Sequence, residues 1–156
     1  MEHEVALVRR FYSAFAARDA SAMTACYHPE VDFRDEVFDL HGAEASGMWR
    51  MLCEQGRDLK ITCTEVRAEG EEVVASWQAD YTFGGTRRVH NEIEARFRFQ
   101  DGRVLHHHDR FDFHAWASQA LGPMGRMFGW TNWMRAKVKR KAHARLRAFL
   151  SKGASA

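Results

Sequence analysis

Apolar residues recur every three or four positions in the first third of the chain, the spacing that gives an α-helix one apolar face. This spacing predicts an amphipathic helix in EVALVRRFYSAFAARD and a short second helix in ASAMTACY, with Asp19 as its N-cap. A third helix is predicted in GAEASGMWRMLCEQG, ending at Gly56. Pro29 ends the second helix, because proline disfavours helical geometry in the residue before it.

Strict alternation of apolar and polar residues predicts strands. The segment VDFRDEVF alternates and places Phe33, Asp35 and Val37 on one face. After the third helix, LKITCTEVRA, EEVVASWQADYTF and RRVHNEIEARFRFQ alternate as well, and Asp101-Gly102 signals a hairpin into a last strand. Helices followed by a meander of long strands indicate an α+β domain with its helices on one side of an antiparallel sheet. A chain of 156 residues is long enough for one such domain with a full core.

The last strand carries three consecutive histidines, in GRVLHHHDRFDFH, and alternation divides them between two faces. His107 and Asp109 share a face with apolar residues, so both are predicted to point into the core. His106 and His108 share the other, polar face together with Val104. Two histidines in this arrangement can chelate a metal, but zinc needs at least a third ligand and the sequence identifies none. We therefore expect no bound metal.

The length of the hairpin loop decides which residues face each other across the last two strands. A two-residue loop would set the apolar face of one strand against the charged face of the next, whereas a three-residue loop at 101–103 joins the two apolar faces. The longer loop predicts Phe97 opposite His107 and Ala95 opposite Asp109. A small residue opposite an inward carboxylate leaves room for a ligand atom.

With these elements in this order, the chain resembles the nuclear transport factor 2-like superfamily, and within it the SnoaL-like and ketosteroid-isomerase-like proteins. The segments VRRFYSAFAARDASAMTACYHPEVDFRD and IEARFRFQDGRVLHHHDRFD carry the resemblance. It implies a cone, in which a strongly curved antiparallel sheet wraps around three N-terminal helices and encloses a pocket open at one end. It also implies a SnoaL-like domain at residues 1–114, followed by a basic helical extension at residues 115–156.

The resemblance implies roles for two carboxylates. Asp35 stands where ketosteroid isomerases keep the aspartate that acts as general base, and Asp109 stands where SnoaL-like cyclases keep an acid/base aspartate. Both oxyanion-hole donors of the isomerases are replaced, the tyrosine by Phe11 and the protonated aspartate by Ala95. Losing one such donor typically slows a reaction by about 10²–10³, so we do not expect a true steroid isomerase. Tyr12 neighbours the lost tyrosine, but one residue turns a helix by about 100°.

Two carboxylates on opposite walls of an apolar pocket, with one histidine, form a competent acid–base set, because burial and mutual repulsion raise carboxyl pKa values toward neutrality. We assign Asp109 as general base or acid, Asp35 as its partner and His107 as the residue that orients Asp109. We expect an isomerase, cyclase or epoxide hydrolase that needs no cofactor and acts on a hydrophobic small molecule. The residues predicted to bind that molecule are Phe11, Phe15, Trp49, Trp77, Tyr81, Ala95, Phe97 and Phe111.

Two other interpretations use the same residues. In one, the chain is a non-catalytic binder of a hydrophobic ligand. In the other, the pocket is vestigial, its aromatic residues are plain core, and the chain is an interaction module that works through its tail. The enzyme interpretation requires that Asp35 and Asp109 share one open cavity. This requirement distinguishes it from the binder and from the interaction module.

Charge divides the chain into an acidic body and a basic tail. Residues 1–112 carry 14 Lys and Arg against 21 Asp and Glu, a net charge of −7, whereas residues 113–156 carry nine Lys and Arg and no Asp or Glu. In the tail, ALGPMGRMFGW is predicted as a loop because glycine and proline interrupt it. We expect this loop to lie near the pocket mouth as a lid. TNWMRAKVKRKAHARLRAFL is predicted as a helix capped by Thr131 that packs on the body or on a sister subunit.

The alternative for the tail is a helix lying on an anionic membrane, anchored by Trp130 and Trp133. Nucleic acid is not expected, since few other aromatics accompany the basic residues. We predict a homodimer through the convex face of the sheet, by analogy with the family and because Val66 and Val74 lie on the otherwise polar faces of their strands. The absence of an apolar run of signal-peptide or membrane-span length, and three cysteines without a CxxC pair, indicate a cytoplasmic protein with reduced thiols.

Overall fold

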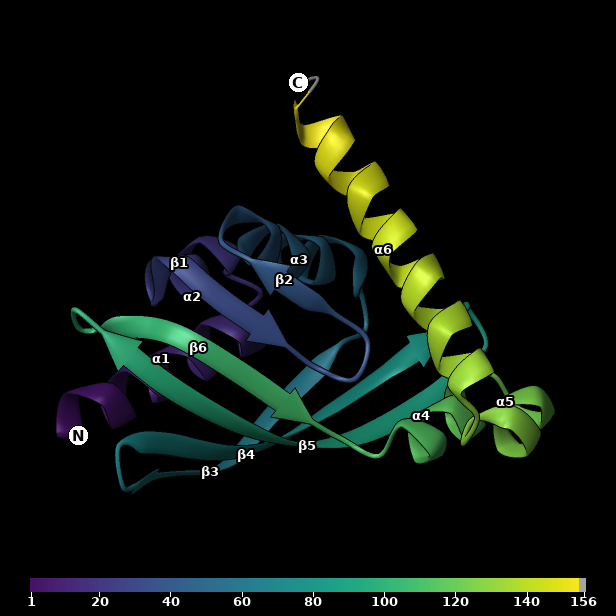
Figure 1. Ribbon diagram of the computed structural model, residues 1–156, viewed down its shortest axis with the longest axis horizontal. Coiled ribbons are helices and arrows are strands. Elements are labelled where there is room, and N and C mark those ends of the chain that lie inside the picture. The colour runs from purple at the N-terminus through teal and green to yellow at the C-terminus, as the bar shows by residue number, and fades with distance from the viewer. Residues whose placement is uncertain (155–156) are drawn as a thin grey trace.

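A computed structural model describes residues 1–154 and has the predicted α+β architecture, a curved and unclosed six-stranded sheet with helices packed against it (Figure 1). The elements in chain order are α1 (Glu2–Ala16), α2 (Ala20–Ala25), β1 (Tyr27–Arg34), β2 (Asp39–His41), α3 (Ala43–Gln55), β3 (Lys60–Glu69), β4 (Glu72–Phe83), β5 (Arg87–Gln100), β6 (Arg103–Arg110), α4 (Phe113–Ala120), α5 (Pro123–Phe128) and α6 (Asn132–Ala154).

The strands lie in the order β2-β1-β6-β5-β4-β3. Neighbouring strands are antiparallel except β1 and β6, which run parallel, so the sheet is mixed where a fully antiparallel sheet was predicted. The reason is that β1 joins the sheet beside the last strand and not beside β3, the next long strand in the chain. This pairing brings Phe33 of β1 next to His107 of β6, and so sets one wall of the site described below.

The first three helices form as predicted and pack on the concave side of the sheet. Asp19 caps α2 by accepting a hydrogen bond from the Ala22 amide at 3.0 Å, and α3 ends at Gly56. Helix α1 contacts β3 and β4. Its buried side chains are Leu7, Val8, Phe11, Tyr12, Ala14 and Phe15.

The turn between β5 and β6 contains two residues, Asp101 and Gly102, so the predicted three-residue loop is wrong. Both have positive φ, 54° and 74°, as a tight hairpin turn requires. The predicted register nevertheless holds, because a bulge adds one residue, Leu105, to β6. The same bulge puts Val104 fully in the core, where the sequence placed it on the polar face. The pairs beyond the bulge are Phe97 with His107 and Ala95 with Asp109.

The outer face of the sheet lacks the apolar pair on which the dimer prediction was based. A register shift in β3 pairs Val66 with Ala75, which turns Val66 into the core. Val74 does lie on the outer face, but Arg67 and Arg96 flank it on the neighbouring strands and it is only 1% exposed. The homodimer stays a prediction, supported by the family analogy alone.

The segment ALGPMGRMFGW completes one helix and forms another, where a loop was predicted. Helix α4 runs to Ala120 and α5 starts at Pro123, which suits the first helical position because its missing N–H would have no partner there. Gly122, at φ 65°, is the N-cap. Gly125 lets α5 approach α4, since a Cβ there would lie 1.8 Å from the Ala117 carbonyl oxygen. Glycine and proline, which usually interrupt helices, thus form the start of α5 and its contact with α4.

Helix α6 starts as predicted and packs on the body. Thr131 Oγ1 accepts a hydrogen bond from the Met134 amide at 3.2 Å, and Met134 is buried. Arg135 pairs with Glu36 at 3.1 Å, in the connection between β1 and β2.

Farther along, α6 contacts α3 and then extends beyond it (Figure 1). Gly47 of α3 lies against Leu150, and Arg145 donates to Gln55 Oε1 at 2.9 and 2.6 Å. None of the helices in residues 1–154 is long and apolar enough to cross a lipid bilayer.

Candidate active site

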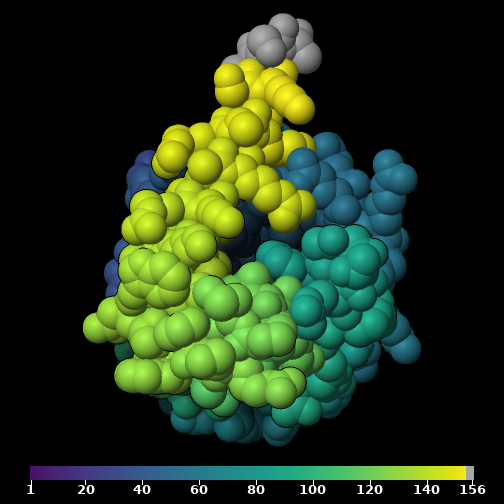
Figure 2. Space-filling model, turned by 90° about the vertical axis from the view of Figure 1, so that its right-hand side faces the viewer, coloured from purple at the N-terminus to yellow at the C-terminus, as the bar shows by residue number. Residues whose placement is uncertain are grey.

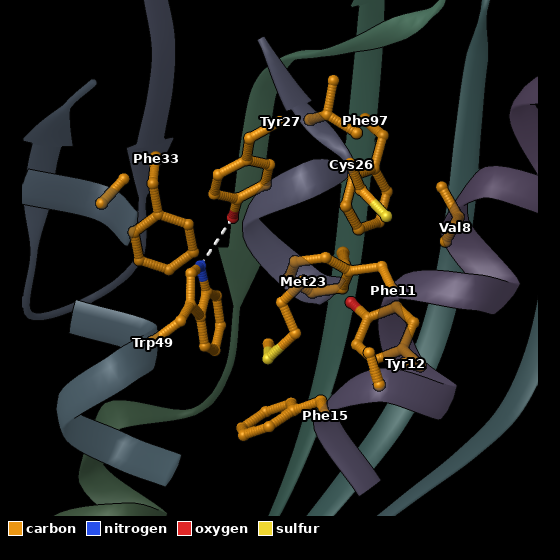
Figure 3. Packing of buried hydrophobic residues seen from close by; sticks show 14 of the residues in the cluster. Val8, Phe11, Tyr12, Phe15, Met23, Cys26, Tyr27, Phe33, Trp49 and Phe97 are labelled. Carbon is orange, nitrogen blue, oxygen red and sulfur yellow. Dashed lines mark hydrogen bonds between the residues drawn. The ribbon is translucent and has the colours of Figure 1, made fainter. Parts of the chain in front are cut away.

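Four buried side chains are joined by hydrogen bonds, and we call them the buried hydrogen-bond chain. Trp49 Nε1 donates to Tyr27 Oη at 2.7 Å (Figure 3), Tyr27 Oη lies 2.7 Å from His107 Nδ1, and His107 Nε2 lies 2.8 Å from Asp109 Oδ1. An indole N–H can only donate, so the Tyr27 hydroxyl can give its own hydrogen to Nδ1. The other ring nitrogen of His107 then donates to Asp109. Every donor points the same way, and the chain ends on a carboxylate.

Aromatic rings enclose His107, which is 1% exposed. The ring centroids of Phe97, Phe33 and Phe11 lie 4.2, 5.0 and 5.5 Å from it, and Trp49 stacks on it at 5.8 Å. Burial of an imidazole is tolerated here because both of its nitrogens are hydrogen-bonded. His107 and Asp109 point inward, as predicted, and His107 is held in one orientation.

Asp109 is the end of the buried hydrogen-bond chain that meets accessible space. Its side chain keeps 4% of its surface accessible, whereas that of His107 keeps none. Only Oδ1 bonds to the histidine, so Oδ2 is left to meet another group.

Tyr12 of α1 packs near the row of the sheet in which Ala95 faces Asp109. Its ring lies 6.1 Å from Phe97 and 5.6 Å from Trp77, the aromatic residues on either side of this alanine row of the sheet. Within residues 1–154, neither the buried Tyr12 hydroxyl nor the buried Trp77 Nε1 has a hydrogen-bond partner. Burial, and then the charge of Asp109, raise the pKa of Tyr12 well above its ordinary value, so the hydroxyl keeps its proton.

Two buried donors therefore lack acceptors, and one of them, the Tyr12 hydroxyl, is close enough to Asp109 for the charge of that carboxylate to act on it. Such groups are uncommon in folded proteins and usually have a water or ligand atom as partner. Figure 3 shows the Tyr12 hydroxyl turned into the core, not out to solvent. A ligand oxygen in this position would satisfy it.

Asp35 lies just after β1, in the turn to β2, and not within a strand as predicted. Its Oδ1 accepts the amides of Val37 and Phe38 at 2.7 and 2.6 Å. Burial outweighs these two bonds and raises the pKa of Asp35 to about 7, with a further contribution from the charge of Asp109. Burial also raises the pKa of Tyr81, and the charge of Asp35 adds to it. Asp35 is therefore close enough to both Asp109 and Tyr81 for electrostatic interaction.

The residues predicted to line a pocket fall into two groups. Tyr81 and Phe111 are partly exposed and pack against both hydrophobic clusters, the large one around α1–α3 and the small one around α4 and the start of α6. Figure 2 shows a hollow among α6, α4 and the β4–β5 hairpin, the elements around the small cluster. The other predicted residues are buried in the large cluster: Phe11, Phe15, Trp49, Trp77, Ala95 and Phe97.

A groove of about 340 Å³ between α1 and β3 reaches Tyr12 from a different side. It is large enough for a small molecule. The side chains that line it are Arg9, Tyr12, Ser13, Ala16, Ile61, Cys63, Thr64, Glu65 and Val66.

His106 and His108 lie on the outer face and are exposed, as predicted. His106 Nδ1 is 3.5 Å from Asp32 Oδ2, and His41 bonds the same aspartate at 2.8 Å and Glu30 at 3.0 Å. Across residues 1–154 no three His, Cys, Asp or Glu side chains are arranged to hold a metal ion. Of the two outer histidines, His106 thus interacts with a carboxylate at the surface.

Tyr27 is the site residue that sequence reasoning missed. Its contact with His107 depends on the parallel pairing of β1 with β6, and no local pattern in the sequence indicates that pairing. Trp49 was predicted to line a pocket, whereas here it donates to Tyr27. Tyr12 could have been found from its position beside Phe11 on the apolar side of the first helix.

Comparison with known proteins gives the family and the fold. The family model described as SnoaL-like domain matches residues 8–107. No curated protein matches the sequence at a significant level.

Several solved structures share the fold. A candidate SnoaL-like polyketide cyclase from Jannaschia sp. CCS1 superposes with a TM-score of 0.67 at 18% identity, covering 78% of this chain and 94% of that one. An LEH-like epoxide hydrolase from M. tuberculosis gives 0.65 at 19% identity, covering 81% and 95%. AclR, a candidate hydroxylase from Streptomyces galilaeus, gives 0.63 at 21% identity, covering 81% and 96%. At these identities the likeness establishes the fold alone.

Proposed function

Because the chain belongs to the SnoaL-like family, we propose that it is a small acid–base enzyme that uses no cofactor and acts on a hydrophobic small molecule. The observation that carries the proposal is the buried hydrogen-bond chain, which ends on Asp109 near the unpaired Tyr12 hydroxyl. Proteins that share the fold bear the names of a polyketide cyclase, an epoxide hydrolase and a hydroxylase.

Asp109 is the general base in this proposal. His107 donates to Oδ1 and is itself held by Tyr27 and Trp49, so the carboxylate has one orientation and Oδ2 can take a proton. His107, Tyr27 and Trp49 are positioning residues, because rings and hydrogen bonds hold them away from any ligand. A fixed base in a water-poor site needs little rearrangement when the proton moves.

Tyr12 and Trp77 are the hydrogen-bond donors for the substrate oxygen. They replace the two donors of the ketosteroid isomerases that this sequence lacks at Phe11 and Ala95. The raised pKa of Tyr12 keeps its hydroxyl protonated, and an indole N–H always donates. Each donor of this kind contributes about 10²–10³ in rate.

Asp35 is the general acid. With a pKa of about 7, it carries its proton over much of the acid and neutral range. The charge of Asp109 contributes to the raised pKa of Tyr12, and the charge of Asp35 contributes to that of Tyr81, which supports a base near Tyr12 and an acid near Tyr81. This separation suits a substrate that loses a proton at one atom and gains one at another.

The reaction class is proton transfer at carbon next to a carbonyl. Asp109 Oδ2 takes the proton, the C–H electron pair passes into the carbonyl system, and the negative charge on oxygen is stabilised by Tyr12 and Trp77. Asp35 gives its proton to the far end of the delocalised system, and the two carboxyl groups exchange protons with solvent to restore the starting state. The partly exposed Tyr81 and Phe111 favour an apolar substrate body.

A non-catalytic binder is the second candidate, and the tight packing around Asp109 favours it. The Tyr12 ring packs between Phe97 and Trp77, and only 4% of the Asp109 side chain is accessible. A binder would use Tyr12 and Trp77 to hold a ligand oxygen without any proton transfer.

Deuterium exchange separates the two candidates without knowledge of the natural substrate. A panel of hydrophobic cyclic ketones in D₂O is followed by NMR for exchange at the carbon next to the carbonyl. The wild-type protein should accelerate exchange of at least one ketone, and Asp109→Asn should lose that acceleration, because the amide can still accept from His107 but cannot take a proton. His108→Asn, on the same strand but facing outward, is the matched control and should retain full exchange.

A ketone that binds the wild-type protein without any exchange would contradict catalysis and support the binder. Exchange that survives in Asp109→Asn would contradict Asp109 as the base.

A further inference from the structure

Large hydrophobic side chains are exposed together at the junction of α5 and α6. Met124, Met127, Trp130 and Trp133 are 49%, 63%, 69% and 54% exposed, and within residues 1–154 Met1 is the one other large hydrophobic residue exposed to this degree. Single exposed apolar residues are ordinary, but a concentration of them marks an interaction site.

These side chains form one ordered surface, which we call the α5–α6 surface. Trp130 Nε1 donates to the Met127 carbonyl at 2.9 Å. The ring of Trp133 meets Phe128 edge-on at 6.1 Å, and the amine of Lys137 lies 5.4 Å above the Trp133 ring. The tryptophans are therefore held in place while exposed.

Basic residues continue this surface along α6. Helical spacing puts three of the basic residues of α6 on the side opposite the buried Met134 and Leu146. Helix α6 can therefore stay packed on the body while this outer side faces solvent. Among residues 1–154 none of the three basic residues of this stripe has a carboxylate within ion-pair distance. The stripe consists of Trp133, Lys137, Arg140 and Arg147.

We propose that the α5–α6 surface binds an anionic lipid bilayer. Tryptophan and methionine would enter the boundary between headgroups and acyl chains, and the basic stripe would lie along the headgroups. Charge also orients the molecule, because residues 1–112 carry a net −7 and residues 113–156 carry no acidic side chain. An anionic surface thus attracts the tail and repels the body, which suits an enzyme that takes a hydrophobic substrate from a membrane.

Other occupants fit the surface less well. On the sheet of a second copy, Glu69, Glu72 and Glu94 already pair with Arg96, so these carboxylates are not free to pair with the basic stripe. Single-stranded nucleic acid is held by aromatic rings that stack on successive bases. Here the apolar residues gather at one end of the basic stripe, and two of them are methionines.

The experiment is co-sedimentation of the full chain with vesicles of phosphatidylcholine, alone or mixed with phosphatidylserine. Binding should require phosphatidylserine and weaken with salt. Trp130→Ala/Trp133→Ala and Lys137→Gln/Arg140→Gln/Arg147→Gln should each lose binding, the triple variant by on the order of 10²-fold. The matched control is Arg57→Gln/Lys60→Gln/Arg103→Gln, which removes three exposed charges from the body and should bind as the wild type does.

Depth of insertion is read from tryptophan fluorescence with brominated lipid as the quencher. Trp49, Trp77 and Trp116 are buried, so quenching that disappears in Trp130→Ala/Trp133→Ala reports the two exposed tryptophans. The proposal is overturned if the protein does not bind phosphatidylserine vesicles at low salt, or if either surface variant binds them as the wild type does. It is also overturned if sedimentation shows that the same variants abolish a dimer, or if single-stranded DNA alone binds this surface.

Discussion

His107 shows how one buried polar side chain can fix a site. Both ring nitrogens are used, one by Tyr27 and one by Asp109, so its orientation and its hydrogen positions are set together. Tyr27 is the link on which this depends, because its oxygen also accepts from Trp49. Tyr12, by contrast, has a buried hydroxyl that bonds nothing in residues 1–154. The two tyrosines therefore predict opposite outcomes for the same substitution.

Tyr27→Phe should destabilise the protein. The change leaves Trp49 Nε1 and His107 Nδ1 buried without partners, at roughly 1–3 kcal/mol for each orphaned group. The free energy of unfolding in urea measures the loss. A variant as stable as the wild type would mean that the buried hydrogen-bond chain does not hold the core together.

Tyr12→Phe should leave stability unchanged or raise it slightly, because the hydroxyl it removes has no partner to lose. The same variant should slow the proposed ketone exchange by about 10²–10³. Urea unfolding and the exchange rate, measured on one sample, give both values. A variant that is less stable but exchanges normally would show that Tyr12 bonds an internal water and has no role toward a ligand.

Asp35 makes stability depend on pH in a defined direction. Its folded pKa of about 7 is above the unfolded value of about 3.9, so between them the unfolded chain ionises while the folded chain keeps its proton. The free energy of unfolding therefore falls as pH rises from about 4 to about 7 and levels off above that. Asp35→Asn keeps an oxygen for the Val37 and Phe38 amides and removes this dependence.

The stability gain of Asp35→Asn over the wild type should grow from pH 4 to pH 7. It should reach about 2–4 kcal/mol, because each unit by which folding raises the pKa corresponds to about 1.4 kcal/mol. Urea unfolding across this range measures it. A difference that stays constant with pH would place the Asp35 carboxyl in water.

Close contact between backbones positions the last helices. Gly125 sits where any side chain would meet the carbonyl of Ala117, so α5 can pack on α4 only with glycine there. Gly153, near the end of α6, has only an ordinary contact with Arg50 at 3.6 Å. Both are helical, which makes them a matched pair.

Gly125→Ala should destabilise the protein by about 1–3 kcal/mol or more, since the clash outweighs the roughly 1 kcal/mol gained in helix propensity. Gly153→Ala should keep that gain. Thermal unfolding of the two variants checks this. Equal effects would contradict the packing of α5 on α4.

The elements themselves were largely predictable, and the errors have physical causes. Helical and alternating periods located α1, α3 and the long strands because each has one buried face. The period could not reveal the bulge at Leu105, which leaves alternation intact on both sides and compensates for a shorter turn. The glycines and Pro123 predicted a loop because these residues usually interrupt helices. Here they start α5 and let it pack on α4, and this packing cannot be read from the sequence pattern.

The site was predictable in part. Alternation was enough to predict that His107 and Asp109 point inward, since the other residues on their face of the strand are apolar. It could not bring Tyr27 to His107, because the parallel pairing of β1 with β6 joins segments far apart in the chain. The charge of Asp109 contributes to the raised pKa of Asp35, and one open cavity shared by the two carboxylates stays a requirement of the proposed function.

Taken as a molecule, the chain combines an enclosed polar site with a charged exterior. Division into a domain at 1–114 and an extension at 115–156 stays a prediction, as does the homodimer through the outer sheet face. Val74 is covered by Arg67 and Arg96, so a dimer through this face must use polar contacts. Sedimentation at micromolar concentration should give a dimer that salt weakens, and a monomer at low salt would contradict this assembly.

The central claim is that Asp109 and Asp35 act as base and acid on one substrate. The most direct test is the pH dependence of double-bond isomerisation in a hydrophobic β,γ-unsaturated ketone, which needs a proton removed at one carbon and delivered at another. In the wild type, kcat should fall as pH rises through about 7, where Asp35 loses its proton. Asp35→Asn should isomerise slowly without this step, yet still exchange deuterium next to the carbonyl through Asp109. Isomerisation by Asp35→Asn at the wild-type rate and with the wild-type pH profile would contradict the pairing of the two carboxylates.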